Sequence, residues 1–239
     1  MTTVNLGQHI HHRYDNELES LRSRVVSMGG LAERQISDAL TALGDHNLEL
    51  AEDVIRTDQR INAQVVNIDE DCTYVLARRQ PAAGDLRTVM SIIKTITDIE
   101  RIGDESEKIA RITIRNAGSV APDMDKIMQQ ITDMGLMVRN SLREALDAFV
   151  RMDVNAAVET ALRDKEIDNR YVSLLTTLTD HIKEAPQDAD ECQSLIWVTR
   201  SLERIGDHCK NICEYVIYLV KGKDVRHTTT DELEQEAKV

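Results

Sequence analysis

The sequence predicts an all-α protein built as two tandem repeats of an antiparallel three-helix bundle, with six long helices. Only three prolines and ten glycines interrupt 239 residues, which leaves long segments free of helix breakers. Within these segments apolar residues recur every three or four positions, as they do on the buried face of a helix. Several motifs also return about a hundred residues later, which indicates an internal repeat. Aromatic residues make up 3% of the chain, so we expect an aliphatic core.

The first repeat is expected within residues 1–117. Apolar periodicity marks three helical segments in it: 16–43, 47–79 and 85–116. Pro81 and Gly84 break the second segment, and Asp85 is placed to cap the third. Gly29 and Gly30 lie inside the first segment, where glycine weakens a helix. We therefore expect both at a close contact with a neighbouring helix.

The second repeat is expected within residues 122–222, and its sequence retraces the first. Met28-Gly29 returns as Met134-Gly135 at an offset of 106 residues, whereas the third helical segment returns at an offset of 103. The hairpin around Pro186 has therefore lost about three residues relative to the first repeat. Two stretches fall outside the repeats, namely the expected linker Gly118–Pro122 and a polar, acidic tail, 223–239, which we expect to be loose.

A six-residue motif in the third helix of each repeat is the most specific feature of the chain. It reads Ile99-Glu100-Arg101-Ile102-Gly103-Asp104 and returns as Leu202-Glu203-Arg204-Ile205-Gly206-Asp207. On a helix its two carboxylates lie one turn apart on one face, which destabilises an isolated helix by a few tenths of a kcal/mol. The glycine costs about 1 kcal/mol relative to alanine. Both features in both repeats predict a cation between the carboxylates and a close approach of another backbone at the glycine.

Counting from the turns places the acidic motifs of neighbouring helices at the same height. Asn62 lies 20 residues before Ala82 and Asp104 lies 22 after it, so at about 1.5 Å per residue both are about 30 Å from the turn. The same count in the second repeat gives the same result. Each repeat is thus expected to bring two acidic pairs face to face. The eight candidate metal ligands are Asp58, Asn62, Glu100 and Asp104 in the first repeat, and Asp164, Asp168, Glu203 and Asp207 in the second.

Clusters of this kind repel themselves unless they are protonated or bind a hard cation. An all-oxygen ligand set favours Mg, Mn, Ca or Fe over soft-metal chemistry. The expected cofactors are divalent or trivalent metal ions with oxygen ligands, a class that covers Fe, Mn, Mg, Ca and Zn. The plainer alternative is a metal-free helical scaffold with solvated acidic faces. In that case Lys108 and Lys210 would form ordinary helix pairs with Asp104 and Asp207.

The composition argues against several classes of protein. A formal net charge of −13 disfavours binding to nucleic acid and to anionic lipid. The longest uncharged run, Tyr171–Thr179, has nine residues, far fewer than the roughly 18 of a membrane span. The N-terminus has no basic region followed by an apolar core, so we expect a cytoplasmic protein. Cys209 and Cys213 have no second thiol pair, so they are expected to be small core residues.

The second candidate function is a carboxylate-bridged di-metal enzyme on a helical bundle. Such sites use Glu-x-x-His on two helices. None of the seven histidines has a glutamate three positions before it. The sequence also lacks a glycine-rich phosphate loop and a nucleophile elbow. We therefore expect a protein that is not an enzyme.

Together these motifs resemble the PhoU family, the accessory proteins of the bacterial high-affinity phosphate transporter. The resemblance covers nearly the whole chain. It rests on the doubled Glu-Arg-Ile-Gly-Asp, on Arg79-Gln80-Pro81-x3-Asp85-Leu86-Arg87, on Met28-Gly29-Gly30 and on Lys221-Gly222-x-Asp224-x-Arg226-His227. It implies two three-helix bundles with metal ions held by E/D-x3-D motifs. It also implies a cytoplasmic homodimer, recruited to the inner membrane face, that represses the phosphate-starvation response by linking the transporter's ATPase subunit to a sensor histidine kinase.

The chain departs from the family pattern in two places. Asn62 stands where the family motif has aspartate, so the first-repeat site has one charge fewer. The second repeat has Asp188-Ala189-Asp190 where the first has Asp85-Leu86-Arg87. A partner contact made by Asp85 and Arg87 is therefore expected in the first repeat only. A role of Asp85 as a helix cap explains that residue equally well.

Overall fold

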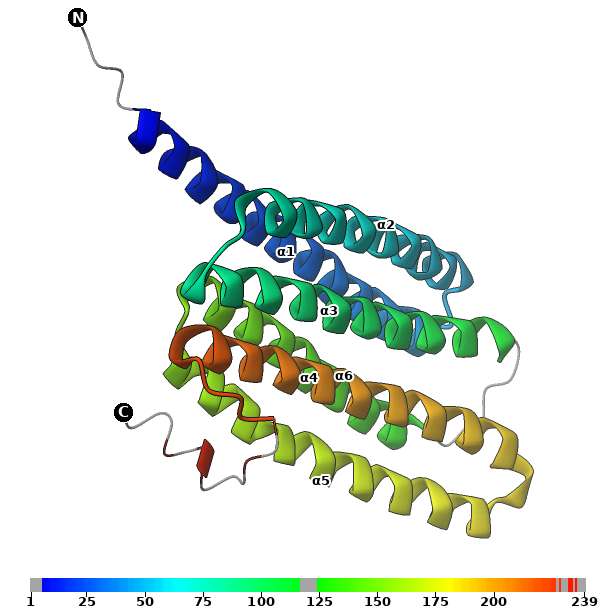
Figure 1. Cartoon of the computed structure of the whole chain (residues 1–239). Coiled ribbons are helices and arrows are strands. Elements are labelled where there is room, and N and C mark those ends of the chain that lie inside the picture. Colours follow the sequence, from blue (N-terminus) through cyan, green and yellow to red (C-terminus); the bar gives the residue numbers. More distant parts are fainter. Residues whose placement is uncertain (1–5, 117–123, 227, 229–231, 234, 236–239) are drawn as a thin grey trace, which may run out of the picture.

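The computed structural model is all-helical over the residues it describes, which are 6–116, 124–226, 228, 232, 233 and 235. The first repeat forms three helices, α1 (Leu6–Gly44), α2 (Leu48–Arg79) and α3 (Ala83–Arg115). The second repeat forms α4 (Asp125–Arg151), α5 (Val154–Glu184) and α6 (Ala189–Lys221), with a short 3-10 helix, η1 (Pro186–Asp188), before α6. Figure 1 shows the antiparallel order of each unit. The predicted fold of six long helices in two three-helix units is confirmed for this part of the chain.

Side-chain caps fix two of the helix starts. Asn47 precedes α2, and its Oδ1 accepts a hydrogen bond of 3.0 Å from the backbone N–H of Leu50. Asp153 makes the same kind of bond at the start of α5. The capping prediction for Asp85 is wrong, because Ala82 is the N-cap of α3 and Asp85 lies in the first turn. In that position the negative charge of Asp85 still faces the positive end of the helix dipole.

The two units lie side by side, with α3 packed on α6 and α1 packed on α4 (Figure 1). The core between the helices is aliphatic, as predicted, and the single phenylalanine, Phe149, is fully buried within it. Cys209 and Cys213 are buried free thiols and belong to this core, as the sequence predicts. None of the described helices combines the length and the apolar character that a membrane crossing requires.

The contact between α1 and α4 is reciprocal. Gly29 on α1 lies under the methyl groups of Leu146, and Gly135 on α4 lies under those of Leu40. A Cβ on either glycine would come within 3.0 Å of a leucine methyl carbon. Both glycines and both leucines are related by the offset of 106 residues, so the two contacts are copies of one another. The predicted close contact is confirmed for Gly29 and wrong for Gly30, which is exposed with open space beside it.

Valine at the two neighbouring glycines is expected to have opposite effects. Gly29→Val places carbon atoms where Leu146 lies, and overpacking of this kind lowers the free energy of unfolding by about 1 to 3 kcal/mol. Gly30→Val meets no atom within 4 Å and gains a few tenths of a kcal/mol from better helix propensity. Urea unfolding of both variants and the wild type measures the difference. Equal stabilities of the two variants would contradict the close contact at Gly29.

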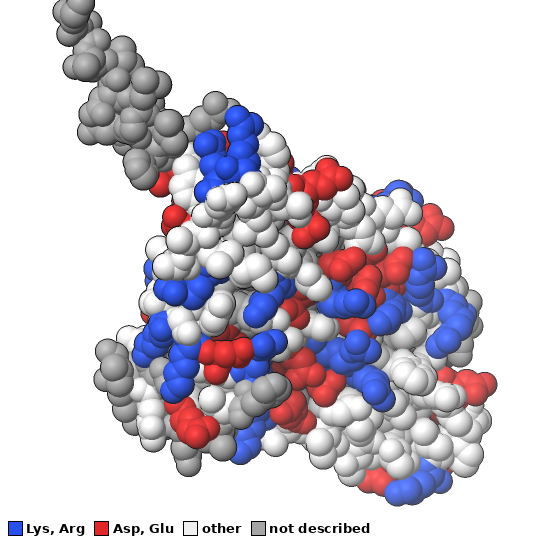
Figure 2. All heavy atoms as spheres, viewed as in Figure 1, with Lys and Arg blue, Asp and Glu red and all other residues white. Residues whose placement is uncertain are grey.

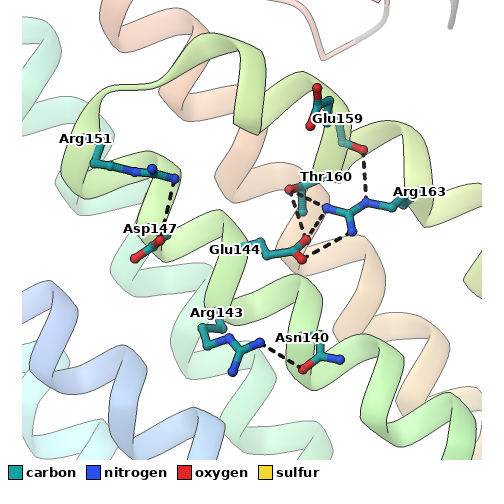
Figure 3. Close-up of polar contacts among 8 residues, drawn as sticks. All are labelled: Asn140, Arg143, Glu144, Asp147, Arg151, Glu159, Thr160 and Arg163. Atoms are coloured by element: carbon teal, nitrogen blue, oxygen red, sulfur yellow. Dashed lines mark hydrogen bonds and ion pairs between the residues drawn. The ribbon is translucent and has the colours of Figure 1, made fainter.

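A polar network joins α4 to α5 at the outer surface. Glu144 on α4 accepts a hydrogen bond of 3.2 Å from Arg163 Nη1, and a longer one of 3.4 Å from the Thr160 hydroxyl. Figure 3 shows these side chains meeting between the two helices. Arg163 directly precedes Asp164, so the network fixes α5 at the height of the candidate metal ligands.

The tail after α6 begins at Gly222, whose φ of +71° is a left-handed conformation that glycine adopts without strain. Val225 and Leu233 of the tail are buried in the core. The expectation of a loose tail is therefore wrong for these two residues. The predicted linker Gly118–Pro122 lies outside the described residues.

Candidate metal centre

Three aspartates of the second repeat converge between α5 and α6. Asp164 and Asp168 lie one turn apart on α5, and Asp207 lies on α6. One carboxylate oxygen from each of the three residues lies within 4.8 Å of the other two oxygens. Calcium ligands lie about 2.3 to 2.6 Å from the ion, so ligands on opposite sides of one ion are up to about 5 Å apart. The three carboxylates are thus close enough to share one ion. Glu203 lies one turn before Asp207 and is not one of the three.

Asp164 is the buried member of this aspartate triad, with 4% of its surface exposed. Its Oδ2 lies 3.3 Å from Lys210 Nζ. Its Oδ1 is buried and has no hydrogen-bond partner among the described residues. A buried oxygen with free lone pairs is unfavourable, because the water it gave up is not replaced. A cation bound at Oδ1 would remove that deficit.

The glycine of the repeated motif makes room for an acidic side chain. A Cβ at Gly206 would lie 3.2 Å from Asp164 Oδ1, and a Cβ at Gly103 would lie 2.9 Å from Asp58 Oδ1. The predicted approach of another backbone is therefore wrong, since the nearest atoms belong to side chains. The physical reason for the glycine is the same in both repeats. A Cβ would crowd the neighbouring aspartate oxygen at both positions, more tightly at Gly103 than at Gly206, where Ile167 lies equally close.

Burial and mutual repulsion raise the pKa values of Asp164, Glu203 and Asp207. Burial raises the pKa of Asp164 to about 6, although the nearby Lys210 ammonium opposes the change. The pKa of Asp207 is raised by burial and then by Asp168. The pKa of Glu203 is raised by burial and then by Asp207. The fully ionised cluster is thus unfavourable in the protein alone, and a bound cation would reverse these effects.

The first repeat builds a related site with amide oxygens. Asp58 on α2 accepts a hydrogen bond of 2.9 Å from Asn62 Nδ2, and Gln35 Nε2 on α1 lies 3.5 Å from its other oxygen. The amide oxygens of Asn62 and Gln35 are buried and unpartnered within the described residues. Asp104 is half-buried on α3, 3.7 Å from Arg101 Nη1. The described part of this repeat holds no set of three carboxylates as close as the aspartate triad.

Besides Asn62, a second residue exchange distinguishes the two sites, and it lies outside the predicted ligands. Lys210 occupies the position that Glu107 has in the first repeat, at the offset of 103 residues. After burial, the strongest charge acting on Asp58 is Glu107, which raises its pKa. The strongest charge acting on Asp164 is Lys210, which lowers its pKa. Extending the comparison of the two motifs by three residues would have revealed the exchange. Gln35, on another helix, gave no such signal.

The lysines do not form the pairs of the plainer alternative. Lys210 pairs across helices with Asp164 rather than with Asp207. Lys108 pairs with Glu105 over 2.8 Å rather than with Asp104. Glu100, the remaining candidate of the first repeat, is half-buried on α3 one turn before Asp104. Cations of the same helix still act on the acidic motifs, since Arg101 lies 3.7 Å from Asp104 on α3 and Lys210 also acts on Asp207 along α6.

The second-repeat site borders a polar pocket of about 560 Å³. Asp207 and Lys210 line it on one side, and Glu214 and Arg226 line it further along. The pocket gives a small hydrated ion a path from solvent to Asp207. Oxygen donors, an unpartnered carboxylate oxygen and this access together fit a hard cation such as Mg, Ca or Mn.

Comparison with known proteins identifies the family to which this architecture belongs. The family model for the PhoU domain matches the chain twice, over residues 25–113 and 131–216. The chain belongs to the PhoU family. The phosphate-specific transport system accessory protein PhoU homolog of Pseudomonas putida is 47% identical over 222 residues, which are 93% of this chain and 86% of that protein. The phosphate-specific transport system accessory protein PhoU of Escherichia coli strain K12 is 40% identical, over 98% of this chain and 96% of that protein.

Two solved structures of PhoU proteins share the fold. The crystal structure of PhoU from Pseudomonas aeruginosa superposes with a TM-score of 0.84 at 44% identity, and the match covers 88% of this chain and 100% of that one. The phosphate transport system regulatory protein PhoU from Streptococcus pneumoniae gives a TM-score of 0.81 at 30% identity, over 89% of this chain and 99% of that one. These matches confirm the two-repeat, all-helical architecture.

The turn that carries the PhoU-like Asp85-Leu86-Arg87 motif contacts the other repeat. Arg87 is half-buried, and its Nε donates a hydrogen bond of 3.4 Å to the carbonyl of Leu219 near the end of α6. A guanidinium beside the last carbonyls of a helix complements the negative end of its dipole. Asp85 is exposed at the start of α3. Arg87 therefore has a contact with the other repeat, whereas the exposed Asp85 acts on the Tyr14 hydroxyl of α1, whose pKa is raised by burial and then by Asp85.

Proposed function

We propose that this protein restrains high-affinity phosphate uptake and represses the phosphate-starvation response when phosphate is plentiful. In this proposal it links the ATPase subunit of a phosphate ABC transporter to a membrane sensor histidine kinase. The observation that carries the proposal is the match to two PhoU domains across the chain. The relatives are named as accessory and regulatory proteins of phosphate transport, which supports a role by contact rather than by turnover.

Metal ions are part of the proposal. Asp164, Asp168, Glu203 and Asp207 would hold an ion in the second repeat, and Asp58, Asn62, Glu100 and Asp104 would hold one in the first. The unpartnered oxygens of Asp164 and Asn62 support this assignment. Bound cations would supply positive charge that offsets carboxylate repulsion and fixes α5 against α6 and α2 against α3. The ions are structural or regulatory in this view, and they activate no substrate.

The remaining elements of the proposal concern location and partners. The protein acts in the cytoplasm as a homodimer and reaches the inner membrane face through its partners. Asp85 and Arg87 are proposed to contact a partner at the turn between α2 and α3. The exposure of Asp85 supports this role. The hydrogen bond from Arg87 to the carbonyl of Leu219 would hold the turn against the end of α6.

A carboxylate-bridged di-metal enzyme is the second candidate, and the aspartate triad is the one observation in its favour. The histidine nearest to that triad is already engaged. His208 Nδ1 lies 2.7 Å from Asp98 Oδ1 on α3. This contact occupies Nδ1 of the histidine at the interface between the repeats. The metal-free scaffold remains the third candidate.

Deletion of the gene is expected to leave phosphate-responsive genes on in high phosphate. The physical reason is that a contact regulator holds its partners in the repressing state, so its loss releases them. A transcriptional reporter in high phosphate measures the output, and its activity should reach the level of phosphate-starved cells. Co-purification from gently solubilised membranes measures the contact with the transporter ATPase or the kinase.

The control for this experiment is the deletion strain supplied with the wild-type gene, in which repression should return. Normal repression in the deletion strain would contradict the regulatory proposal. Metal-dependent turnover of a small molecule by the purified protein, abolished in Asp168→Asn/Asp207→Asn, would favour the di-metal enzyme instead.

A further inference from the structure

The only tryptophan of the chain is exposed. Trp197 lies on α6 with 51% of its surface accessible. It borders a groove of about 240 Å³ between α3 and α6, whose other lining residues are Lys108, Arg111, Ile112, Arg115 and Ser201. We call this hollow the Trp197 groove. An exposed aromatic ring beside a hollow with an apolar floor is typical of a surface that binds another molecule.

The Trp197 groove is basic although the chain as a whole carries a net charge of −13. Three of its six lining residues are cations and none is a carboxylate. Figure 2 shows Lys and Arg gathered over the C-terminal half of α3 and the facing part of α6. Arg115 donates to the Ser194 hydroxyl over 3.4 Å, and Arg200 is exposed one turn after Trp197. Arg115 forms no ion pair with a carboxylate among the described residues, whereas Arg200 acts electrostatically on Glu203, one turn further along α6.

The remaining cations beside the groove are only partly neutralised. Lys108 lies 2.8 Å from Glu105, and the same carboxylate also contacts Arg204 over 3.1 Å. Arg111 pairs with Glu107 over 2.7 Å along α3. One carboxylate is thus shared by two cations, and both acids lie outside the lining of the groove. The local excess of positive charge favours an anionic occupant.

At the position equivalent to the Trp197 groove in the other repeat, the cation and the aromatic rings contact one another. Lys94 on α3 corresponds to Trp197 at the offset of 103 residues, and Tyr218 on α6 corresponds to Arg115. There Lys94 Nζ lies 5.1 Å from the ring centroid of Tyr218 and 5.4 Å from that of Tyr215. Cation and aromatic ring thus satisfy one another within the chain. In the Trp197 groove the aromatic residue, Trp197, stands at the position of Lys94, and the cation, Arg115, stands at the position of Tyr218. Among the described residues no cation lies over the indole ring.

We propose that the Trp197 groove binds an acidic segment of a partner protein. Carboxylates of that segment would pair with Arg111, Arg115 and Arg200, and an apolar side chain between them would cover Trp197 and Ile112. Inorganic phosphate would engage the cations and leave the indole ring in water. An anionic bilayer would have to overcome the repulsion of the whole acidic chain. A peptide segment is the occupant that satisfies both the charge and the apolar floor.

The single tryptophan allows a direct test, because all indole fluorescence of the wild type reports on the groove. The probe is a synthetic peptide of about a dozen residues made of repeated Glu-Glu-Leu units, short enough to lie along two helix faces. Titrated at low ionic strength, it is expected to give a saturable change in Trp197 emission. Arg111→Gln/Arg115→Gln should weaken binding by about tenfold or more, and added salt should weaken binding to the wild type.

The matched control is Arg56→Gln/Lys183→Gln, which removes two exposed cations from α2 and α5 and should bind the peptide like the wild type. Circular dichroism checks that each variant is folded. The proposal is overturned if the peptide gives no saturable change or if both double variants bind equally. It is also overturned if inorganic phosphate or phosphatidylglycerol vesicles displace the peptide and produce the same emission change. The titration contains no component of phosphate transport, so its failure would leave the proposed regulatory function standing, and the reverse also holds.

Discussion

Removal of bound metal from the wild-type protein is expected to lower its melting temperature by about 5 to 10 °C. A ligand present at 100 times its dissociation constant stabilises the folded state by about 2.7 kcal/mol. For a protein of this size each kcal/mol shifts the melting temperature by about 2 to 4 °C. The proposed cause is the aspartate triad, in which Asp168 repels Asp207 when no cation is bound, although nearby basic side chains such as Lys210 oppose that repulsion. Calorimetry before and after chelation, followed by return of Mg, Ca or Mn, measures the shift.

Variants separate this explanation from a general effect of the chelator. Glu203→Gln/Asp207→Asn removes two carboxylates from the site, so its melting temperature should change little on chelation. Glu159→Gln/Glu166→Gln removes two exposed carboxylates of α5 and should respond like the wild type. Equal chelator shifts in all three proteins would favour the metal-free scaffold.

A second large effect is expected from pH, through Glu214 on α6. Burial is the main cause that raises the pKa of this carboxyl from 4.5 to about 7. Because the folded-state pKa is the higher one, the protonated form favours folding. The stability it contributes is complete below about pH 4.5 and is lost as the pH rises through 7. At about 1.4 kcal/mol per pKa unit, the loss by pH 8 is about 3 kcal/mol.

Glu214→Gln mimics the protonated side chain and isolates this contribution. Urea unfolding at several pH values should show the variant more stable than the wild type by about 3 kcal/mol near pH 8 and equal to it near pH 4. Glu166→Gln, at an exposed site on α5, is the matched control and should track the wild type at every pH. A constant difference between Glu214→Gln and the wild type across the pH range would contradict the assignment.

The helices could be predicted where burial leaves a periodic pattern, and less well where it does not. The buried stripe of α2 begins at Ala51, and the predicted start of this helix at residue 47 lies within one residue of the observed start at Leu48. The start of α1 at Leu6 lies ten residues before the predicted start at residue 16, although Leu6, Ile10 and Tyr14 continue the apolar spacing of the helix in that direction. The N-cap of α3 was also missed. Gln80 and Ala83 both adopt positive φ angles. Such angles are uncommon for residues other than glycine, so they cannot be predicted from the residue type.

The candidate site was only partly predictable for a similar reason. Helix rise and turn position sufficed to bring Asp164, Asp168 and Asp207 together, because both depend on local geometry alone. The contact of Lys210 with Asp164 depends on how a long side chain reaches across a helix pair, which the spacing along one helix cannot reveal. Gln35 enters from α1, a helix without an acidic motif, and only the packed bundle shows its position.

The reciprocal contacts of Gly29 with Leu146 and of Gly135 with Leu40 have the form of an isologous dimer interface, in which residue i meets j and j meets i. In a true homodimer every substitution appears in both subunits at once. Here the two halves are encoded in tandem, so each is inherited and altered on its own. The exchange of Glu107 for Lys210 is a change that only such a fusion permits, and it leaves one molecule with two carboxylate sites of unlike charge.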